Sequence, residues 1–375
     1  MLPTDLAYEG FAREMVARGD STVRDYPRLQ FGGSQLSAPA TQWAGDLLLR
    51  TAAGAAAGLV VAALIALLMA RSLAATHSGF APALKDLLAD RTTLPLRAAL
   101  ITLGLLVMLI GATAFLAAEY HVLGTDRTGR DVLVLALKSV RTAFVIGTLS
   151  SLATLPVAIV LGVLAGYLKG WVDEVVQYFY TCLSSVPNVL LIAACVLMMQ
   201  VFLDKHPELF ETGVERSDIK LFLLCVILGL TGWATLCRLV RAETLKLREL
   251  DYVQAATAFG VSDARIMRRH ILPNVMHLVL ITTVLQFSDL VLYEAVLTYV
   301  GVGIDPSMSS FGGMINLSRS EMSREPVVWW SFIAAFGFMV ALVLAANLFA
   351  DGVRDAFDPR ARAFRPRLGV KRALG

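Results

Sequence analysis

Charged residues are scarce in this sequence. Only 17% of its 375 residues are Asp, Glu, Lys or Arg, and 57% are hydrophobic, whereas a soluble globular protein carries roughly 25% charged residues. This composition excludes an ordinary soluble domain and indicates a membrane protein. The formal net charge of +3 is too small to indicate a nucleic-acid partner, and we expect none.

Motifs for several chemistries are also missing. No GxxxxGK[ST] loop occurs, so the chain cannot bind ATP through one, and we expect it to hold no cofactor of its own. The cysteines lie in apolar segments without CxxC spacing, which predicts small buried side chains rather than disulfides or metal ligands. They are Cys182, Cys195, Cys225 and Cys237. His270 and His277 are two helical turns apart, but Pro273 interrupts the register, so we predict no metal site. The first residues lack a basic region followed by an apolar run, so no cleavable signal peptide is expected.

Long apolar runs, in contrast, are abundant. A bilayer needs about 20 residues per helix, and the runs that qualify are 47–70, 97–118, 142–168, 180–203, 221–240, 276–300 and 327–350. We therefore predict an all-α membrane protein. The spacings Gly54-x-x-x-Gly58 and Gly162-x-x-x-Gly166 fit close helix packing, although chance also produces them.

Lys and Arg favour one orientation. They concentrate in 238–270 and in the C-terminal tail, which two runs separate, so both can be cytoplasmic. The same alternation places the N-terminus outside, where its arginines fit poorly, so the side of the first run stays open. Residues 1–46 are expected to form an amphipathic or disordered extension.

The most patterned polar stretch is 251–274, DYVQAATAFGVSDARIMRRHILPN. An alanine-rich helix is expected from Tyr252, and Gly260 should end it because glycine adopts the left-handed conformation at no Cβ cost. Ser262 should cap a second short helix, and Pro273 should end that one. Two short helices bent at a glycine suit docking into a groove on another protein.

Two carboxylates lie within the sixth apolar run. Asp289 and Glu294 would each cost roughly 2.5–3.5 kcal/mol at the bilayer centre, so neither should face lipid. They are candidates for a translocation path, where they would meet a substrate amine or a bound cation; the alternative is a polar contact to a partner subunit or a nearby tyrosine. Ser184 and Asn188 flank Pro187, which either breaks a helix so that polar groups line the path, or simply begins one.

The stretch 251–274 resembles the EAA loop of ABC-importer permeases, and most closely that of the C-type permease of dipeptide, oligopeptide and nickel importers. In that family the loop forms coupling helices that sit in a cleft of the cytoplasmic ATPase. The resemblance makes the following positions ATPase-coupling residues: Tyr252, Gln254, Ala255, Ala256, Gly260, Arg265, His270, Leu272 and Pro273. Gln254 replaces the family's usual glutamate, which weakens a salt-bridge role there.

Other stretches carry the same resemblance, which covers about 97–360. GTDRTGRD at 124–131 is similar to a family signature, expected as a glycine turn at the outer membrane interface. Its motif residues are Gly124, Asp126, Gly129, Arg130 and Asp131. Glu294 matches the family's EAALSFLG position, and 346–360 is similar to its NLxGDGLRDALDP ending.

The resemblance implies a six-helix type I importer permease core with an extra N-terminal transmembrane helix, in a bacterial inner membrane. The expected parts are an extension at 1–46, the extra helix at 47–70, a connecting segment at 71–96, the core at 97–360 and a basic cytoplasmic tail at 361–375. Implied partners are a B-type permease, two cytoplasmic ATP-binding subunits that hold ATP and Mg²⁺, an extracytoplasmic binding protein and membrane lipid.

The expected function is transport without catalysis by this chain, and the substrate stays open among short peptides, nickel chelates and larger peptide-like molecules such as microcins or siderophores. An ion-coupled secondary transporter using Asp289 and Glu294 is the alternative, but the internal repeats that it would show are not found. A membrane enzyme would need clustered catalytic groups, and two carboxylates five residues apart on a helix point in different directions.

Overall fold

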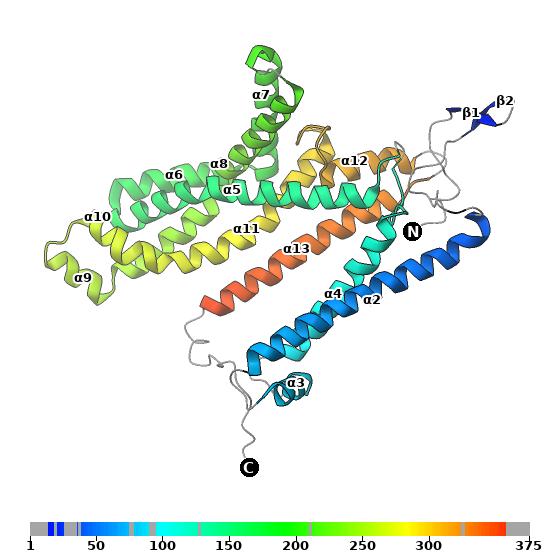
Figure 1. Cartoon of the computed structure of the whole chain (residues 1–375). Coiled ribbons are helices and arrows are strands. Elements are labelled where there is room, and N and C mark those ends of the chain that lie inside the picture. Colours follow the sequence, from blue (N-terminus) through cyan, green and yellow to red (C-terminus); the bar gives the residue numbers. More distant parts are fainter. Residues whose placement is uncertain are drawn as a thin grey trace. The chain divides into compact units, whose positions relative to one another are not determined.

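The computed structural model describes residues 14–18, 21–25, 36, 39–74, 79–89, 95–126, 129–209, 212–323 and 327–357. Helices dominate these residues (Figure 1). Seven of the described helices are long and apolar enough to cross a membrane: Gln42–Ala74, Leu96–Ala117, Val132–Leu168, Asn188–Lys205, Gly213–Arg248, Asp263–Val300 and Trp330–Ala356. Each overlaps one predicted run, so the predicted all-α membrane fold with an extra N-terminal helix is confirmed.

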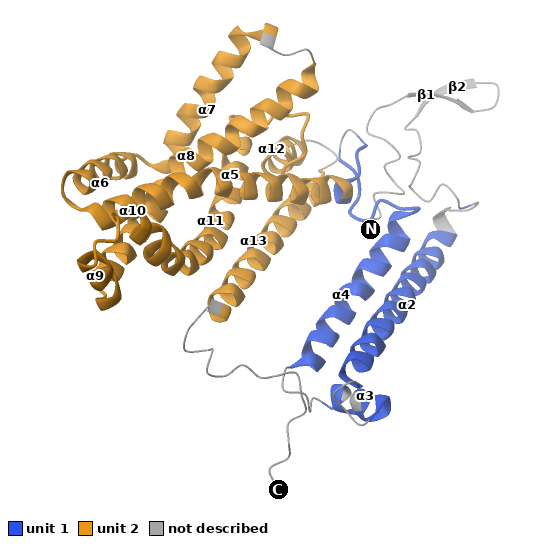
Figure 2. Ribbon diagram, turned by 60° about the vertical axis from the view of Figure 1, so that its left-hand side comes forward, with its two compact units in different colours: residues 1–133, 359–375 blue, residues 134–358 orange. Residues whose placement is uncertain are grey.

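The chain falls into two compact units (Figure 2), 1–133 with 359–375 and 134–358. The elements of the first unit are β1 (Glu14–Arg18), β2 (Ser21–Asp25), α2 (Pro39–Ala74), α3 (Phe80–Leu88) and α4 (Leu96–Ala117). The two strands form an antiparallel hairpin within the segment where the sequence indicated only an extension. The predicted core boundary at 97 separates α2 from α4, whereas contacts group these helices together.

Glycines bring α2 and α4 into close contact. A Cβ on Gly58 would lie 2.6 Å from the carbonyl oxygen of Val107 and 2.7 Å from the Cα of Met108, which is closer than side-chain carbon can approach. Tyr120, after α4, is fully buried and donates a 2.6 Å hydrogen bond to Asp46 Oδ2 on α2. The Gly54-x-x-x-Gly58 spacing therefore marks a helix contact rather than a chance pattern.

The second unit contains most of the described residues. Its elements are α5 (Val132–Leu168), α6 (Gly170–Ser185), α7 (Asn188–Lys205), η1 (Pro207–Leu209), α8 (Gly213–Arg248), α9 (Asp251–Ala258), α10 (Asp263–Ile266), η2 (Met267–Ile271), α11 (Leu272–Val300), α12 (Phe311–Met322) and α13 (Trp330–Phe357). Gly162 and Gly166 let α5 approach α8, since a Cβ on Gly162 would lie 2.8 Å from the Cβ of Val240. This second GxxxG spacing also marks a helix contact.

The prediction of where the fourth span starts is wrong. The run 180–203 crosses the boundary at which α6 ends at Ser185 and α7 begins at Asn188. Pro187, which has no N–H to donate, occupies the N-cap position of α7, and its carbonyl accepts hydrogen bonds from the N–H groups of Leu190 and Leu191 at 3.0 and 3.1 Å. Pro187 therefore lies at a break between two helices and begins the second of them.

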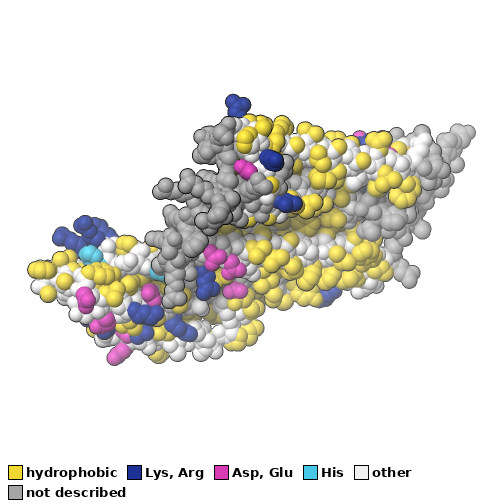
Figure 3. All heavy atoms as spheres, turned by 90° about the horizontal axis from the view of Figure 1, so that it is seen from below, with side chains coloured by type: hydrophobic (Ala, Val, Ile, Leu, Met, Phe, Trp, Pro, Cys, Tyr) yellow, Lys and Arg dark blue, Asp and Glu magenta, His cyan; other side chains and the backbone are white. Residues whose placement is uncertain are grey.

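The surface of the described residues is largely apolar, as lipid contact requires. Figure 3 shows hydrophobic side chains over broad stretches, with histidine and many of the charged side chains at the left-hand end, where Figure 1 has α9 and α10, and other charged side chains in the middle and upper part of the view. Cys225 and Cys237 are buried as predicted, but Cys195 is half-buried and Cys182 is exposed, so the prediction is wrong for Cys182. The predicted tail 361–375 lies outside the described residues.

Candidate functional site

The polar stretch 251–274 forms two short helices bent at a glycine, as predicted. Gly260 has φ of +72°, the left-handed conformation that costs glycine nothing. Its N–H donates to the carbonyl of Thr257 at 3.0 Å, and the N–H of Val261 donates to the carbonyl of Ala256 at 3.1 Å. This pair of bonds is a Schellman motif, which satisfies the last carbonyls of α9 and fixes the direction in which the chain leaves it.

Two details of that stretch differ from the prediction. Ser262 occupies the N-cap position of α10, but its side chain makes no cap hydrogen bond. Pro273 does not end the second helix, because α10 continues through the π-helical turn Met267–Ile271 into α11, where Pro273 lies in the first turn. A wider turn accommodates the missing N–H and the ring, so the docking element is continuous with a membrane-spanning helix.

One face of α9 is anchored and the opposite face is exposed. Val253 is buried together with Ile266 in a cluster formed with α5, α6 and α8. Tyr252, Gln254 and Ala255 are exposed, and Phe259 is 87% exposed. Gln254 donates from Nε2 to the carbonyl of Glu249 at 3.1 Å, so its amide is engaged with the backbone of its own chain. The exposed apolar tip of α9 has the character of a docking surface.

The base of this element is clamped to the end of α5. Tyr167 Oη donates to Asp263 Oδ1 at 3.0 Å, and Arg248 Nη1 donates to the carbonyl of Tyr167 at 2.6 Å. The Arg248 guanidinium also lies over the Tyr167 ring, 5.6 Å from its centroid. Lys169 Nζ pairs with Glu249 at 3.1 Å. Sequence patterns did not indicate this clamp, because its members come from distant parts of the chain.

The remaining predicted coupling residues of 251–274 lie near a second set of contacts, between Tyr252, His270 and Asn274. Asn274 donates from Nδ2 to Tyr252 Oη at 3.3 Å and to the carbonyl of His270 at 2.6 Å. The rings of Tyr252 and His270 lie 6.0 Å apart. Arg265 is exposed, Leu272 is half-buried and Pro273 is exposed. The second histidine, His277, shares a 2.6 Å hydrogen bond between Nδ1 and the carbonyl of Asn274.

An ion pair joins α6 to α8 beside this element. Asp173 pairs with Arg241, and the Nη2–Oδ2 bond is 2.6 Å. Both side chains are largely buried, at 15% and 20% exposed. Hydrogen bonds from Arg241 hold the pKa of Asp173 below its usual value, against the opposing effect of burial. The pair fixes the angle at which the short helix α6 lies on α8.

A cavity of about 500 Å³ with both polar and apolar lining lies within the second unit, beside the α6–α7 break. Three residues predicted for the translocation path, Ser184, Asn188 and Asp289, line it together. Sequence reasoning missed other polar lining residues, which are Thr154, Thr231, Thr235, Gln286 and Tyr293. Their spacing was a usable signal, since Thr231 and Thr235 recur at i, i+4 and Gln286 and Asp289 at i, i+3 within apolar helices.

Glu294 occupies a different environment from Asp289. It is fully buried, and it does not line the cavity. Its Oε1 accepts a 2.7 Å hydrogen bond from Thr298 Oγ1, which in turn accepts from the N–H of Ile304 at 3.2 Å. Gly303 and Gly312 pack directly against Thr298. In this structure Glu294 therefore ties α11 to the loop that follows it.

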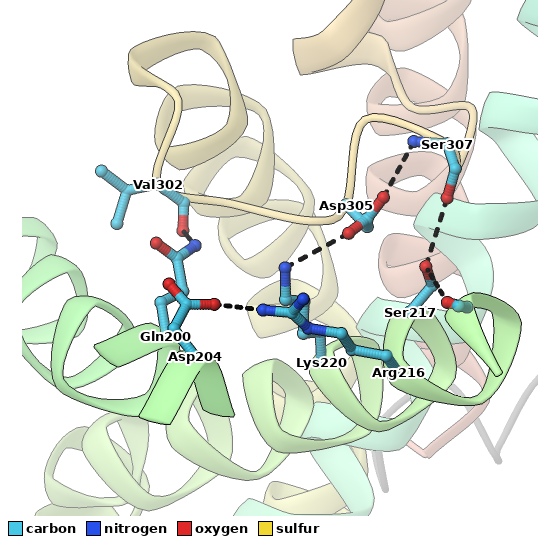
Figure 4. Close-up of polar contacts among 9 residues, drawn as sticks. Gln200, Asp204, Arg216, Ser217, Lys220, Val302, Asp305 and Ser307 are labelled. Carbon is cyan, nitrogen blue, oxygen red and sulfur yellow. Dashed lines mark hydrogen bonds and ion pairs between the residues drawn. The ribbon is translucent and has the colours of Figure 1, made fainter. Parts of the chain in front are cut away.

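That loop is also held to α7 and α8 by a polar network, drawn in Figure 4. Lys220 pairs with Asp305 at 3.2 Å, and the N–H of Ser307 donates to Asp305 Oδ1 at 3.1 Å. Burial alone would raise the pKa of Asp305, but the hydrogen bonds from Ser307 and Lys220 lower it below its usual value. Gln200 Nε2 donates to the carbonyl of Val302 at 3.1 Å, so both ends of the loop are fastened.

The GTDRTGRD motif is a compact turn in the first unit. Gly124 and Gly129 both have positive φ, 75° and 78°. Asp126 is buried, and its two carboxylate oxygens accept from the backbone N–H and the Nε of Arg130 at 2.9 and 2.8 Å. Asp131 Oδ2 lies 2.6 Å from His121 Nδ1. The motif residues stabilise the turn that precedes α5; their location at an outer interface stays a prediction.

The sequence is similar to known transport proteins. The family described as "binding-protein-dependent transport system inner membrane component" matches residues 158–363. The oligopeptide transport system permease protein OppC of Haemophilus influenzae is 30% identical over 65% of this chain and 71% of its own length. OppC of Mycobacterium bovis is 30% identical over 65% of this chain and 78% of its own. The glutathione transport system permease protein GsiD of Pectobacterium atrosepticum is 31% identical over 65% and 74%.

Proposed function

This chain belongs to the binding-protein-dependent transport system inner membrane component family, as a C-type permease of the peptide ABC importers, and from that premise we propose that it forms half of a translocation path for peptides and couples to a separate ATPase through 251–274. Members of the family are transport subunits rather than enzymes. The observation that carries the coupling proposal is the exposed tip of α9, with Phe259 87% exposed, on a base that the rest of the chain holds in place.

The docking element has the properties of a helix that inserts into a groove. Its exposed side presents small Ala255 beside large Phe259, so a partner surface can approach the helix backbone while the aromatic ring fills a pocket. Arg265, Arg268 and Arg269 are exposed next to it, which favours the cytoplasmic side of the membrane by the positive-inside rule. The partner surface is therefore proposed to belong to a cytoplasmic ATP-binding subunit, which would hold the ATP and Mg²⁺.

Movement of the docking element would be transmitted to the cavity through the contacts between these helices. α9 packs on α5, α6 and α8 through Val253, and α10 is tied to α5 by the Tyr167–Asp263 hydrogen bond. α10 also continues into α11, which carries Asp289 into the cavity. A displacement of α9 by the ATPase would therefore move the cavity walls as rigid helices rather than deform the loop. Rocking of these helices against the B-type permease would switch the path between the two sides of the membrane.

The substrate proposal follows the relatives. Their names specify oligopeptide and glutathione transport, so we infer a peptide or peptide-like solute for this chain, delivered by an extracytoplasmic binding protein. The polar cavity fits such a solute, because hydroxyl and amide side chains can replace the water that a peptide backbone loses. We place the assembly in the bacterial inner membrane, with 251–274 and the C-terminus in the cytoplasm.

The ion-coupled alternative receives no support from the two carboxylates. Such a transporter would need Asp289 and Glu294 to hold a coupling ion together, whereas Asp289 lines the cavity and Glu294 is buried with Thr298. We therefore retain ATP-driven import as the function that the geometry supports best.

The test is affinity purification of the chain from its native membrane in mild detergent, comparing wild type with Phe259→Ala and with a variant in which 254–260 is scrambled. We expect an ATP-binding subunit and a second permease with wild type. The scrambled variant should lose the ATP-binding subunit and keep the second permease. Phe259→Ala should weaken ATPase binding by about 2 kcal/mol, or roughly thirtyfold, if the ring is an interface anchor.

Val214→Ala is the matched control, because Val214 is also highly exposed, at 73%, but lies at the start of α8. It should leave ATPase binding unchanged. Recovery of wild type with no ATP-binding subunit in any mild detergent would contradict the proposal, as would full ATPase binding by the scrambled variant.

A further inference from the structure

We propose that the cavity beside Asp289 is a site for the cationic amino group of the transported solute, with Asp289 as its counter-charge. The inference deepens the proposed function by naming what part of the substrate this half of the path recognises. It rests on the cavity's composition, on the placement of Asp289 within it, and on the partners of the neighbouring charged groups.

Two polar stripes, one on α11 and one on α8, line the cavity. On α11, Gln286, Asp289 and Tyr293 recur at intervals of three and four residues, so they lie along one side of the helix. On α8, Thr231 and Thr235 do the same. At the α6–α7 break, Ser184 and Asn188 add a hydroxyl and an amide beside the apolar Leu183, Val186 and Pro187. These neutral groups can accept or donate hydrogen bonds but carry no charge.

Asp289 is the single formally charged residue among the described residues that line the cavity. Its side chain makes no ion pair with a described residue, in contrast to Asp173 and Asp305, which each have a basic partner. Intramembrane carboxylates normally pair with another group or face a water-filled path. The cavity therefore presents negative charge and neutral acceptors, and a primary ammonium group, with three donors and one positive charge, complements both.

Arg238 is the nearby cation whose role must be accounted for. Its Nη2 donates to the Ser184 hydroxyl at 3.3 Å, and its guanidinium lies over the Tyr180 ring, 5.0 Å from the centroid. It thus occupies the rim beside α6 and does not pair with Asp289 in the described structure. The solute would therefore have to supply the positive charge that Asp289 attracts, and every peptide with an unblocked N-terminus carries one.

The cavity's preference for cations can be measured with thiol reagents in the complete importer. A cysteine at Gln286, in a Cys182→Ser background, would be labelled with a cationic trimethylammonium-ethyl or an anionic sulfonatoethyl methanethiosulfonate. Residues at i, i+3 are about 5–6 Å apart, and a unit charge at that distance in a wet protein environment changes local ion concentrations about tenfold. We expect the cationic-to-anionic rate ratio to fall about tenfold or more in Asp289→Asn and to persist in Asp289→Glu.

A cysteine at the exposed Val214 is the control, because its rate ratio should not respond to Asp289→Asn. The second readout is uptake of trialanine into proteoliposomes containing the assembled importer. Losing one charge-assisted hydrogen bond should slow uptake about tenfold in Asp289→Asn, with Asp289→Glu retaining most of the rate and ATPase binding unchanged in both variants.

The outcomes separate the possibilities. An unchanged labelling ratio in Asp289→Asn, or normal trialanine uptake by that variant, overturns the proposal. If uptake by wild type instead stops when choline replaces Na⁺ and K⁺, Asp289 holds an alkali ion rather than the solute's amine, which also overturns it. Failure of wild type to bind an ATPase contradicts the proposed function alone, because the labelling ratio still reports whether the cavity favours cations.

Discussion

Replacing Gly166 by alanine tests the packing that supports the docking element. A Cβ at this position would lie 2.7 Å from the Cβ of Thr244 and 2.8 Å from the carbonyl oxygen of Arg241, whereas carbon atoms prefer about 3.5–4.0 Å. α5 and α8 would have to separate by roughly 1 Å at this point, and overpacking of that kind costs about 1–3 kcal/mol. Alanine recovers about 0.5–1 kcal/mol as a better helix former, so a net loss of about 1–2 kcal/mol is expected.

The assay is reversible unfolding of the purified chain in mixed micelles with increasing dodecyl sulfate, read by circular dichroism. Gly337→Ala is the matched control, because Gly337 is also helical but a Cβ there would meet nothing within 4 Å. The control should be neutral or slightly stabilising. Equal unfolding free energies for the two variants would refute the reasoning that the α5–α8 contact depends on the absence of a side chain.

Two further predictions concern the docking element and the ion pair beside it. A Cβ at Gly260 would meet nothing within 4 Å, so substitution there is restricted by the left-handed backbone rather than by space. Gly260→Leu should therefore cost about 1–2 kcal/mol and reduce ATPase recovery, while Gly260→Asn should be tolerated. Equal ATPase recovery by the two variants would contradict this. Asp173→Asn should lower the unfolding free energy by about 2 kcal/mol at pH 7. Because the folded-state pKa of Asp173 lies below its usual 3.8, this contribution is complete above that value and lost as the pH falls further. The difference between the two proteins should therefore shrink as the pH falls below 3.8, and a difference that stays constant would be inconsistent with the ion pair.

The membrane-spanning helices were predictable because burial in lipid demands long apolar runs, and these are visible in any window of sequence. The residues at which the helices begin and end were not predictable in this way. α5 starts at Val132 and α8 extends from Gly213 to Arg248, well beyond the runs 142–168 and 221–240. Backbone hydrogen bonding continues into polar residues at the edges of the membrane, where hydropathy gives no signal.

Contacts between distant residues were beyond the reach of local patterns. Tyr167 and Asp263 are separated by 96 residues, and neither is distinctive in its own segment. The bend at Gly260 was predictable because glycine's freedom at positive φ is a property of that residue alone. The π-helical turn before Pro273 was not, because a proline in the first turn of a helix and a proline that ends one have the same local sequence.

Asp289 and Glu294 show how two similar signals acquire different roles. Both stood out because a carboxylate inside an apolar run is costly, and that cost can be met either by exposure to a polar cavity or by internal hydrogen bonds. Five residues of helix rotate a side chain by about 140°, so when Asp289 faces the cavity, Glu294 must face elsewhere. It faces Thr298 and the loop that begins at Gly301, where it joins α11 to the segment that Lys220 fastens to α8. The loop is thus held at its two ends by separate contacts, and a helix that moves with α9 would carry both the cavity's charge and this loop.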